Sequence, residues 1–150
     1  MSEKLDEIYS IINKVLKNIN QPKLGMNERL KPEKLNFVGY ERYWSAKEDR
    51  KLFFMIEIDE TRVTFHIDRT EEIPEFSYNQ IIENRKEFEK FIEVLFTHNS
   101  QITHKGNKTI VEFLDKNNNS IYSFKYFNGI GLNFLKKKKI FEYPPYFQTN

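Results

Sequence analysis

The sequence Lys51–Asp68, KLFFMIEIDETRVTFHID, holds two strands and the turn that joins them. Apolar residues occupy every second position of both halves: Leu52, Phe54, Ile56 and Ile58 in Lys51–Asp59, then Val63, Phe65 and Ile67 in Arg62–Asp68. Side chains of a strand point alternately to its two faces, so this period predicts two half-buried strands. The short turn Asp59-Glu60-Thr61 makes them antiparallel neighbours, with one apolar face and one wet face.

Upstream of this hairpin the sequence predicts a helix and one more strand. The helix runs from about Ser2 to Ile19, since its apolar residues recur at helical spacing: Leu5, Ile8, Ile12, Val15, Leu16 and Ile19. Residues 20–36 contain Pro22, Gly25 and Pro32 and are expected to form an irregular connection with a helical turn near Glu33. A loosely alternating strand is expected over Phe37–Ser45.

Downstream, an acidic loop over residues 69–76 leads into a second helix. Ser77 and Gln80 have the spacing of a capping box, and the helix is expected to end near Thr97. Turn residues at Gly106-Asn107 and Asn117–Asn119 then separate a second set of strands. These strands are Gln101–Lys105, Lys108–Asp115 and Ser120–Phe127.

The expected order is therefore helix, three strands, helix, three strands. This order predicts an α+β fold with a mainly antiparallel sheet and helices packed on one face. The chain of 150 residues has the length of one domain, 1–150, with 130–150 as an irregular C-terminal tail that contains Pro144 and Pro145.

Composition excludes several kinds of chemistry. The chain has no cysteine, which excludes disulfides, thiolate nucleophiles and cysteine-ligated zinc. The longest run of aliphatic and aromatic residues, Leu52–Ile56, is far shorter than the roughly 20 residues that span a bilayer. Residues 1–20 lack the apolar stretch of a signal peptide, so a cytoplasmic location without membrane contact is expected.

Catalytic motifs are weak. The sequence has no G-x-S-x-G, and Gly129-Ile130-Gly131 lacks the third glycine of a nucleotide-binding loop. One wet strand face would gather Glu57, Asp59, His66 and Asp68, a set that could act in acid–base catalysis. Charged outward faces usually serve solubility, so a solvated face is the simpler interpretation.

Neither a metal site nor a cofactor is expected. His98 and His104 flank one short loop and could approach each other, but no third ligand stands at a known spacing.

An uneven charge distribution indicates two candidate binding segments. Residues 57–93 contain eleven Asp/Glu against five Lys/Arg, and their acidic loop is the first candidate for binding a basic protein partner. Its predicted contact residues are Asp68, Glu71, Glu72, Glu75 and Phe76. The alternative is a solvated loop whose Phe76 packs into the core.

The second candidate is a basic segment near the C-terminus, where lysines and aromatic residues are mixed as in single-strand binders. Its predicted polyanion-binding residues are Lys136, Lys137, Lys138, Lys139, Tyr143 and Tyr146. The alternative is an edge strand that lysines protect from unwanted pairing.

These exclusions favour binding over catalysis. The sequence predicts a protein-binding module, and in particular a small inhibitor of the immunity type that neutralises a toxin partner such as a basic nuclease. Nucleic-acid or polyanion binding through Lys136–Lys139 is the alternative. An enzyme that uses the acidic and histidine strand face is the weakest hypothesis.

Overall fold

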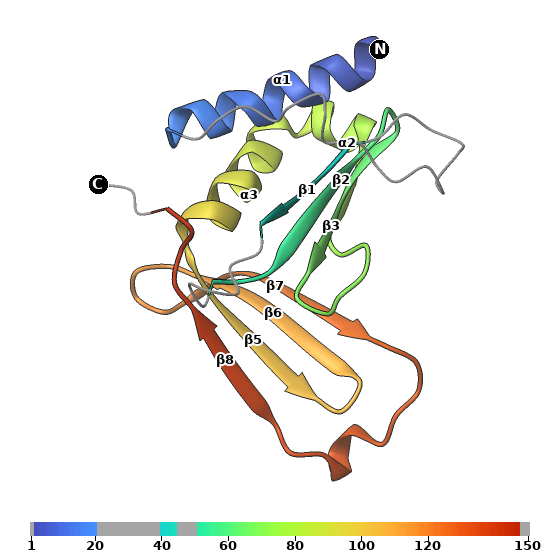
Figure 1. The fold of residues 1–150 in the computed structure, drawn as a ribbon, viewed down its shortest axis with the longest axis vertical. Coiled ribbons are helices and arrows are strands. Elements are labelled where there is room, and N and C mark those ends of the chain that lie inside the picture. The colour runs from blue at the N-terminus through green and yellow to red at the C-terminus, as the bar shows by residue number, and fades with distance from the viewer. Residues whose placement is uncertain (1, 21–39, 45–50, 148–150) are drawn as a thin grey trace.

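The computed structural model describes residues 2–20, 40–44 and 51–147 (Figure 1). Its helices are α1 (Glu3–Asn18), α2 (Tyr78–Glu83) and α3 (Arg85–Thr97), with one 3₁₀ turn, η1 (Asn133–Leu135). Its strands are β1 (Tyr40–Trp44), β2 (Phe54–Ile58), β3 (Arg62–Ile67), β4 (Glu75–Ser77), β5 (Asn99–Lys105), β6 (Lys108–Leu114), β7 (Ser120–Phe127) and β8 (Lys139–Tyr143). The expected helical turn near Glu33 lies outside the described residues.

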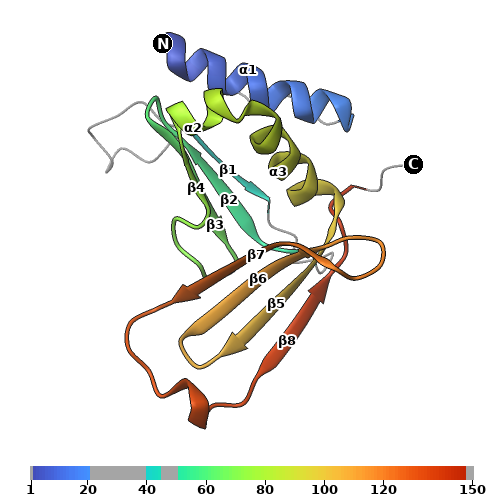
Figure 2. The same ribbon diagram turned by 180° about the vertical axis from the view of Figure 1, so that it is seen from behind.

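The α+β class is confirmed, but the strands form two antiparallel sheets. The first has the order β1-β2-β3-β4, with β4 only three residues long, and the second has the order β7-β6-β5-β8. Figure 2 shows the second sheet below the first, with β7 and β8 at its edges. The predicted hairpin forms as expected, with Ile56 opposite Phe65.

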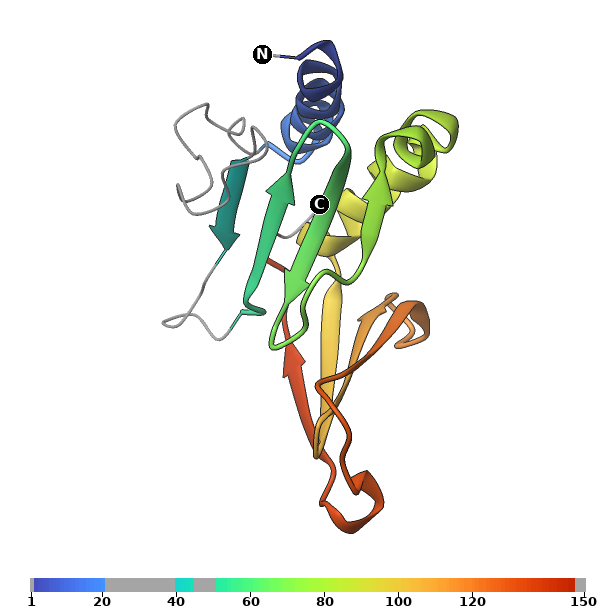
Figure 3. The same ribbon diagram turned by 90° about the vertical axis from the view of Figure 1, so that its right-hand side faces the viewer.

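Helix α3 covers one face of the first sheet (Figure 3) and also reaches the second. Its Phe91 ring lies 5.0 Å from Phe65 of β3 and 6.1 Å from Phe113 of β6, centroid to centroid. Tyr122 and Phe124 of β7 complete this cluster at 5.2 and 5.8 Å. One aromatic side chain therefore joins the two sheets in a single core, and α1 packs against α3 from outside.

The expected N-terminal helix forms with its apolar stripe inward. Ser2 is the N-cap, and its side chain accepts a hydrogen bond from the Leu5 N–H. All predicted stripe residues are buried except Ile19, which is half-buried.

The second predicted helix is wrong in one respect, because it is broken at Asn84. The capping box is present: Ser77 Oγ accepts from the Gln80 N–H, and Gln80 Oε1 accepts from the Ser77 N–H. Asn84 has φ −121° and ψ 45°, outside the helical region, and its carbonyl accepts from the Glu87 and Phe88 N–H groups. α2 therefore ends there and α3 begins with a new direction.

The C-terminal segment is more regular than expected. β8 pairs antiparallel with β5, placing Phe141 opposite Ile102 and Tyr143 opposite Ser100. It is a five-residue edge strand preceded by lysines, which is the alternative that the sequence left open for this segment. Beyond it, the Phe147 N–H donates to the Phe96 carbonyl at 3.0 Å, tying this end of the chain to α3.

Candidate functional site

The most exposed apolar side chains gather in the loop between β7 and β8, residues Asn128–Lys138, here called the tip. Ile130 is 106% exposed, Leu132 62%, Phe134 73% and Leu135 67%. Figures 1 and 3 place the tip at the end of the second sheet farthest from α1. Exposing four large apolar side chains of one short loop to water is unfavourable, and such exposure often marks an interaction site.

Polar side chains hold the tip in place from within. Asn107, in the β5–β6 turn, donates from Nδ2 to the carbonyls of Asn128 at 3.3 Å and Gly129 at 2.5 Å. Asn133 Oδ1 in turn accepts from the Asn107 N–H at 3.0 Å. The usual pattern is inverted here, because the asparagines face inward while the apolar residues face solvent.

Two glycines make this close approach possible. Gly106 has φ 61°, and a Cβ there would collide with the Asn133 side chain. A Cβ on Gly131 would lie 2.9 Å from Cγ of Asn107. A side chain at either position would displace the asparagine that holds the tip, and the positive φ of Gly106 favours glycine further. The tip is therefore a loop whose conformation is fixed by specific hydrogen bonds and close backbone contacts.

The C-terminal side of the tip is basic. Residues 128–141 contain four lysines and no Asp or Glu. Lys136–Lys139 are all exposed, and within the described part of the chain none of them forms an ion pair. The exposed apolar side chains of the tip lie next to lysines that form no ion pair within the described residues, a combination suited to binding a partner.

The two tyrosines predicted to act with these lysines lie elsewhere. Tyr143 is half-buried in β8, and Tyr146 is half-buried against the Phe54 and Phe96 rings at 5.3 and 6.4 Å. The Tyr146 hydroxyl donates to the Leu52 carbonyl, and burial raises the pKa of this phenol far above its usual range. Tyr146 therefore supports the core, whereas Phe134 and Phe141 are exposed rings beside the lysines.

The acidic loop is largely engaged within the molecule. Asp68 Oδ2 lies 2.5 Å from His104 Nε2, and Glu75 Oε2 lies 2.8 Å from Arg62 Nη1. Glu72 is 4.0 Å from the same guanidinium, and Glu71 hydrogen-bonds Tyr126. Glu71, Glu72 and Glu75 are exposed. The Arg62 guanidinium offsets part of the negative charge of Glu72 and Glu75.

Phe76, predicted as an apolar anchor for a partner, belongs to the core. Its ring lies 5.3 Å from Phe88 and 5.5 Å from Phe91. The alternative interpretation, in which Phe76 packs inward, is confirmed.

The acidic and histidine strand face is not the wet surface that the sequence indicated. Glu57 and Asp59 are each 4% exposed. Glu57 Oε2 lies 3.5 Å from His66 Nε2, whereas Asp59 Oδ1 closes the β2–β3 turn by accepting from the Thr61 and Arg62 N–H groups at 2.7 and 3.0 Å. The expectation of one solvated face was wrong because β2 and β3 bury residues on both faces. The four side chains do not converge on one point.

The other two histidines occupy opposite ends of β5. His98 is the C-cap of α3, and its backbone N–H donates to the Val94 carbonyl at 3.0 Å. Its Nδ1 lies 3.0 Å from Thr97 Oγ1, and burial lowers its pKa. His104 contacts Asp68 and the Phe141 ring, whose centroid is 5.1 Å away. In the described ranges no three His, Asp or Glu side chains are arranged to hold a metal ion.

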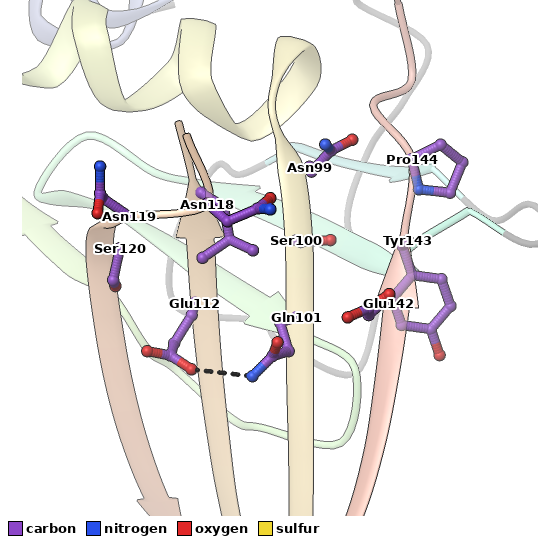
Figure 4. Close-up of a pocket in the computed structure, with 11 residues that line it drawn as sticks. Asn99, Ser100, Gln101, Glu112, Asn118, Asn119, Ser120, Glu142, Tyr143 and Pro144 are labelled. Carbon is purple, nitrogen blue, oxygen red and sulfur yellow. Dashed lines mark hydrogen bonds between the residues drawn. The ribbon is translucent and has the colours of Figure 1, made fainter. Parts of the chain in front are cut away.

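A shallow groove of about 820 Å³ crosses the second sheet at its other end (Figure 4). Its lining is rich in amides and carboxylates, including Asn99, Gln101, Glu112, Asn118, Asn119 and Glu142. Gln101 Nε2 donates to Glu112 Oε2 at 3.4 Å. These residues come from β5, β6, β8 and the turn after β6. Because they are far apart in the sequence, no sequence pattern predicts the groove.

No protein-family model, curated protein or solved structure matches the chain. Among the described helices, none is long and apolar enough to cross a bilayer. The tip residues Ile130, Leu132 and Leu135 were missed from the sequence, although apolar residues between Gly129 and the lysine run were the available signal.

Proposed function

We propose that this protein is a protein-binding module whose binding surface is the tip. The observation that carries the proposal is the exposure of Ile130, Leu132, Phe134 and Leu135 on a loop held by Asn107 and Asn133. Burying one such side chain contributes about 1.5–3 kcal/mol, and a loop already fixed in shape loses little entropy on binding.

The partner's site has the complementary chemistry. An apolar cleft with an acidic rim would accept the tip and pair with Lys136–Lys139. A protruding, ordered loop suits insertion into a cleft, so an inhibitor of the immunity type would block a toxin in this way. The basic partner expected from the acidic loop has less support, because Glu75 already pairs with Arg62 and Asp68 already pairs with His104 of the same chain.

The test is affinity capture from lysate of the source cells with matched variants. The triple variant L132S/F134S/L135S should lose the stoichiometric protein partner that the wild type captures. The control is Ile82→Ser, which changes an exposed apolar residue on α2. Retention of the same partner by the triple variant would refute the proposal.

Polyanion binding is the second candidate, favoured by the four exposed lysines Lys136–Lys139. Capture of nucleic acid would support it if binding fell steeply with salt, since phosphate contacts release counterions. Changing Lys136–Lys139 to Gln should then abolish binding, whereas the triple variant should retain most of it. The triple variant therefore separates the two candidates, because it should lose a protein partner but keep a bound polyanion.

A further inference from the structure

β8 forms one edge of the second sheet, and its outer side has no strand partner in the described part of the chain. Figures 2 and 3 show β8 along the margin of that sheet. Its apolar side chains are open to solvent on both faces, since Ile140 is 50% and Phe141 39% exposed. An edge strand that is apolar on both faces is a template for pairing with a further strand.

The direction of the backbone groups at this edge follows from the strand register. The two-residue turn between β5 and β6 makes Lys105 and Lys108 a hydrogen-bonded pair. Residues of a strand direct their N–H and C=O groups alternately to its two sides, so His104 bonds its partner on β8, which is Lys139. Ile140, the next residue along β8, therefore directs its N–H and C=O away from the sheet.

The same alternation extends to the residues on either side of Ile140. It requires the Asn128 N–H to face the Asn107 carbonyl, and that hydrogen bond is present at 3.0 Å. It gives Lys138 and Glu142 the same outward direction as Ile140, and their side chains share one face of the sheet. Lys138 and Glu142 form no ion pair within the described residues. The open edge thus offers unpaired backbone groups between one free positive and one free negative charge.

We propose that β8 pairs with β8 of a second copy of this chain, antiparallel about a two-fold axis at Ile140. The axis is perpendicular to the second sheet, so the second sheets of the two copies join into one continuous sheet. Ile140 then lies opposite Ile140 of the other copy, and Lys138 of each copy lies opposite Glu142 of the other. All three residues direct their backbone groups at the new neighbour, as hydrogen-bonded pairs require.

This register places no like charges directly opposite each other. On the other face of the joined sheet, Lys139 lies across from Phe141 of the second copy, and an ammonium group is attracted to an aromatic ring. The two Lys139 side chains are diagonal neighbours at about 7–8 Å and can turn apart into solvent. Lys125 lies on β7, separated from β8 by β6 and β5, and stays outside the interface.

The neighbouring registers are less favourable. Sliding one strand by two residues in one direction places Pro144 opposite Lys138, and proline has no N–H to donate. Sliding it by two residues in the other direction places Lys139 directly opposite Lys139, where like charges repel. The sequence around β8 therefore selects the register centred on Ile140.

The same charges favour a second copy over an unrelated strand. Lysines beside an edge strand usually prevent pairing. Lys138 would face no negative charge on most other strands, whereas β8 of a second copy supplies Glu142 at the opposite position. Discrimination of this kind uses one repulsive and one attractive element.

The size of the contact predicts a weak dimer. One pair of short strands buries far less than the roughly 1,600 Å² of a standard stable interface. Dissociation in the micromolar range or weaker is therefore expected.

The test is charge reversal followed by sedimentation velocity over a concentration series. Glu142→Lys and Lys138→Glu should each weaken association at least about tenfold, since each places like charges together at both symmetric contacts. An equimolar mixture of the two variants should associate like the wild type, because both contacts then join opposite charges. The double variant E142K/K138E should do the same.

A second pair of variants tests the backbone. Ile140→Pro removes the outward N–H without removing a hydrogen bond to β5, and it should abolish association. Ile140→Ala keeps that N–H and should weaken association less. Equal association of these two variants would show that the strands do not pair through Ile140.

Restoration by mixing shows that the charge variants are folded, so loss of folding cannot imitate the result. Glu93→Lys, an exposed change on α3, should leave association unaltered. A wild-type protein that stays monomeric up to about 1 mM, or charge variants that the mixture does not restore, would overturn the proposal. The tip variant L132S/F134S/L135S should still dimerise, which separates this proposal from the tip proposal.

Discussion

Asp115 shows how one side chain closes a hairpin. Its Oδ1 accepts from the Asn117 and Asn119 N–H groups, both at 2.8 Å, and its Oδ2 accepts from Asn119 Nδ2 at 3.1 Å. The hydrogen bond from the Asn119 backbone, followed by that from its side chain, holds the pKa of Asp115 below its ordinary value of 3.8. Asn118 between them adopts φ 61°.

This carboxylate predicts a pH-dependent contribution to stability. Because the folded pKa of Asp115 lies below 3.8, its stabilisation is present above that pH and is lost as the pH falls through the folded pKa. Asp115→Asn should therefore unfold more easily than the wild type at pH 7, and the gap between them should narrow toward pH 3. Urea unfolding at both pH values measures it, and a gap independent of pH would contradict it.

At the scale of elements, the local patterns predicted the strands and caps well. The two strands of Lys51–Asp68 and the capping box at Ser77 depend on neighbouring residues and are confirmed, whereas the solvated second face of those strands is not. β8 was expected only as an alternative, because its alternation covers only five residues and begins at the last of four lysines. The break at Asn84 was missed because its flanks continue the apolar period that indicates one helix.

The tip was missed for a different reason. Exposed apolar residues have the same sequence signature as buried ones, and only the placement of the loop distinguishes them. Asn107 and Asn133 are 26 residues apart, so their contact follows from tertiary structure and not from spacing.

The scaffold of the tip yields a local prediction. Asn133→Ala removes the acceptor for the Asn107 N–H, worth about 1 kcal/mol, or about fivefold in local opening. Trypsin should then cleave at Lys136–Lys139 about fivefold faster, while the midpoint of global unfolding changes little. Asn128→Ala is the control, because Asn107 contacts only the Asn128 backbone. Equal cleavage rates in the two variants would show that Asn133 does not hold the loop.

At the scale of the whole molecule, Arg69 joins the two sheets at the surface. From the loop after β3, its Nη2 donates to the carbonyls of Gly106 at 2.9 Å and Lys108 at 2.7 Å, and its Nε donates to Thr109 Oγ1. The neighbouring Asp68–His104 pair spans the same junction. No pattern in the sequence places the β3 loop beside the β5–β6 turn, so this arrangement could not be predicted.

Loss of this contact should loosen the junction. Arg69→Ala should lower the free energy of unfolding by about 2 kcal/mol, since three hydrogen bonds from a charged donor are lost at a partly solvated site. Arg69→Lys should recover little, because an ammonium group cannot reproduce the guanidinium fork. Urea denaturation checks both, together with faster hydrogen exchange in the β5–β6 turn.

Arg85→Ala is the matched control, because Arg85 makes an exposed pair with Glu89 at 3.0 Å and should change stability by less than about 1 kcal/mol. An effect of Arg69→Ala no larger than this control would mean that the junction does not depend on Arg69.

The contacts of Tyr146 also bear on the order in which the protein can be made. The Tyr146 hydroxyl donates to the carbonyl of Leu52, 94 residues earlier in the chain. Lys51 Nζ donates to the Tyr146 carbonyl at 2.9 Å. During translation, the hairpin that begins at Lys51 therefore leaves the ribosome long before Tyr146, which it contacts, has been synthesised. Until β8 follows, the edge of β5 is open to any other strand. A nascent chain stalled before Lys139 should thus depend on chaperones more than the released protein does.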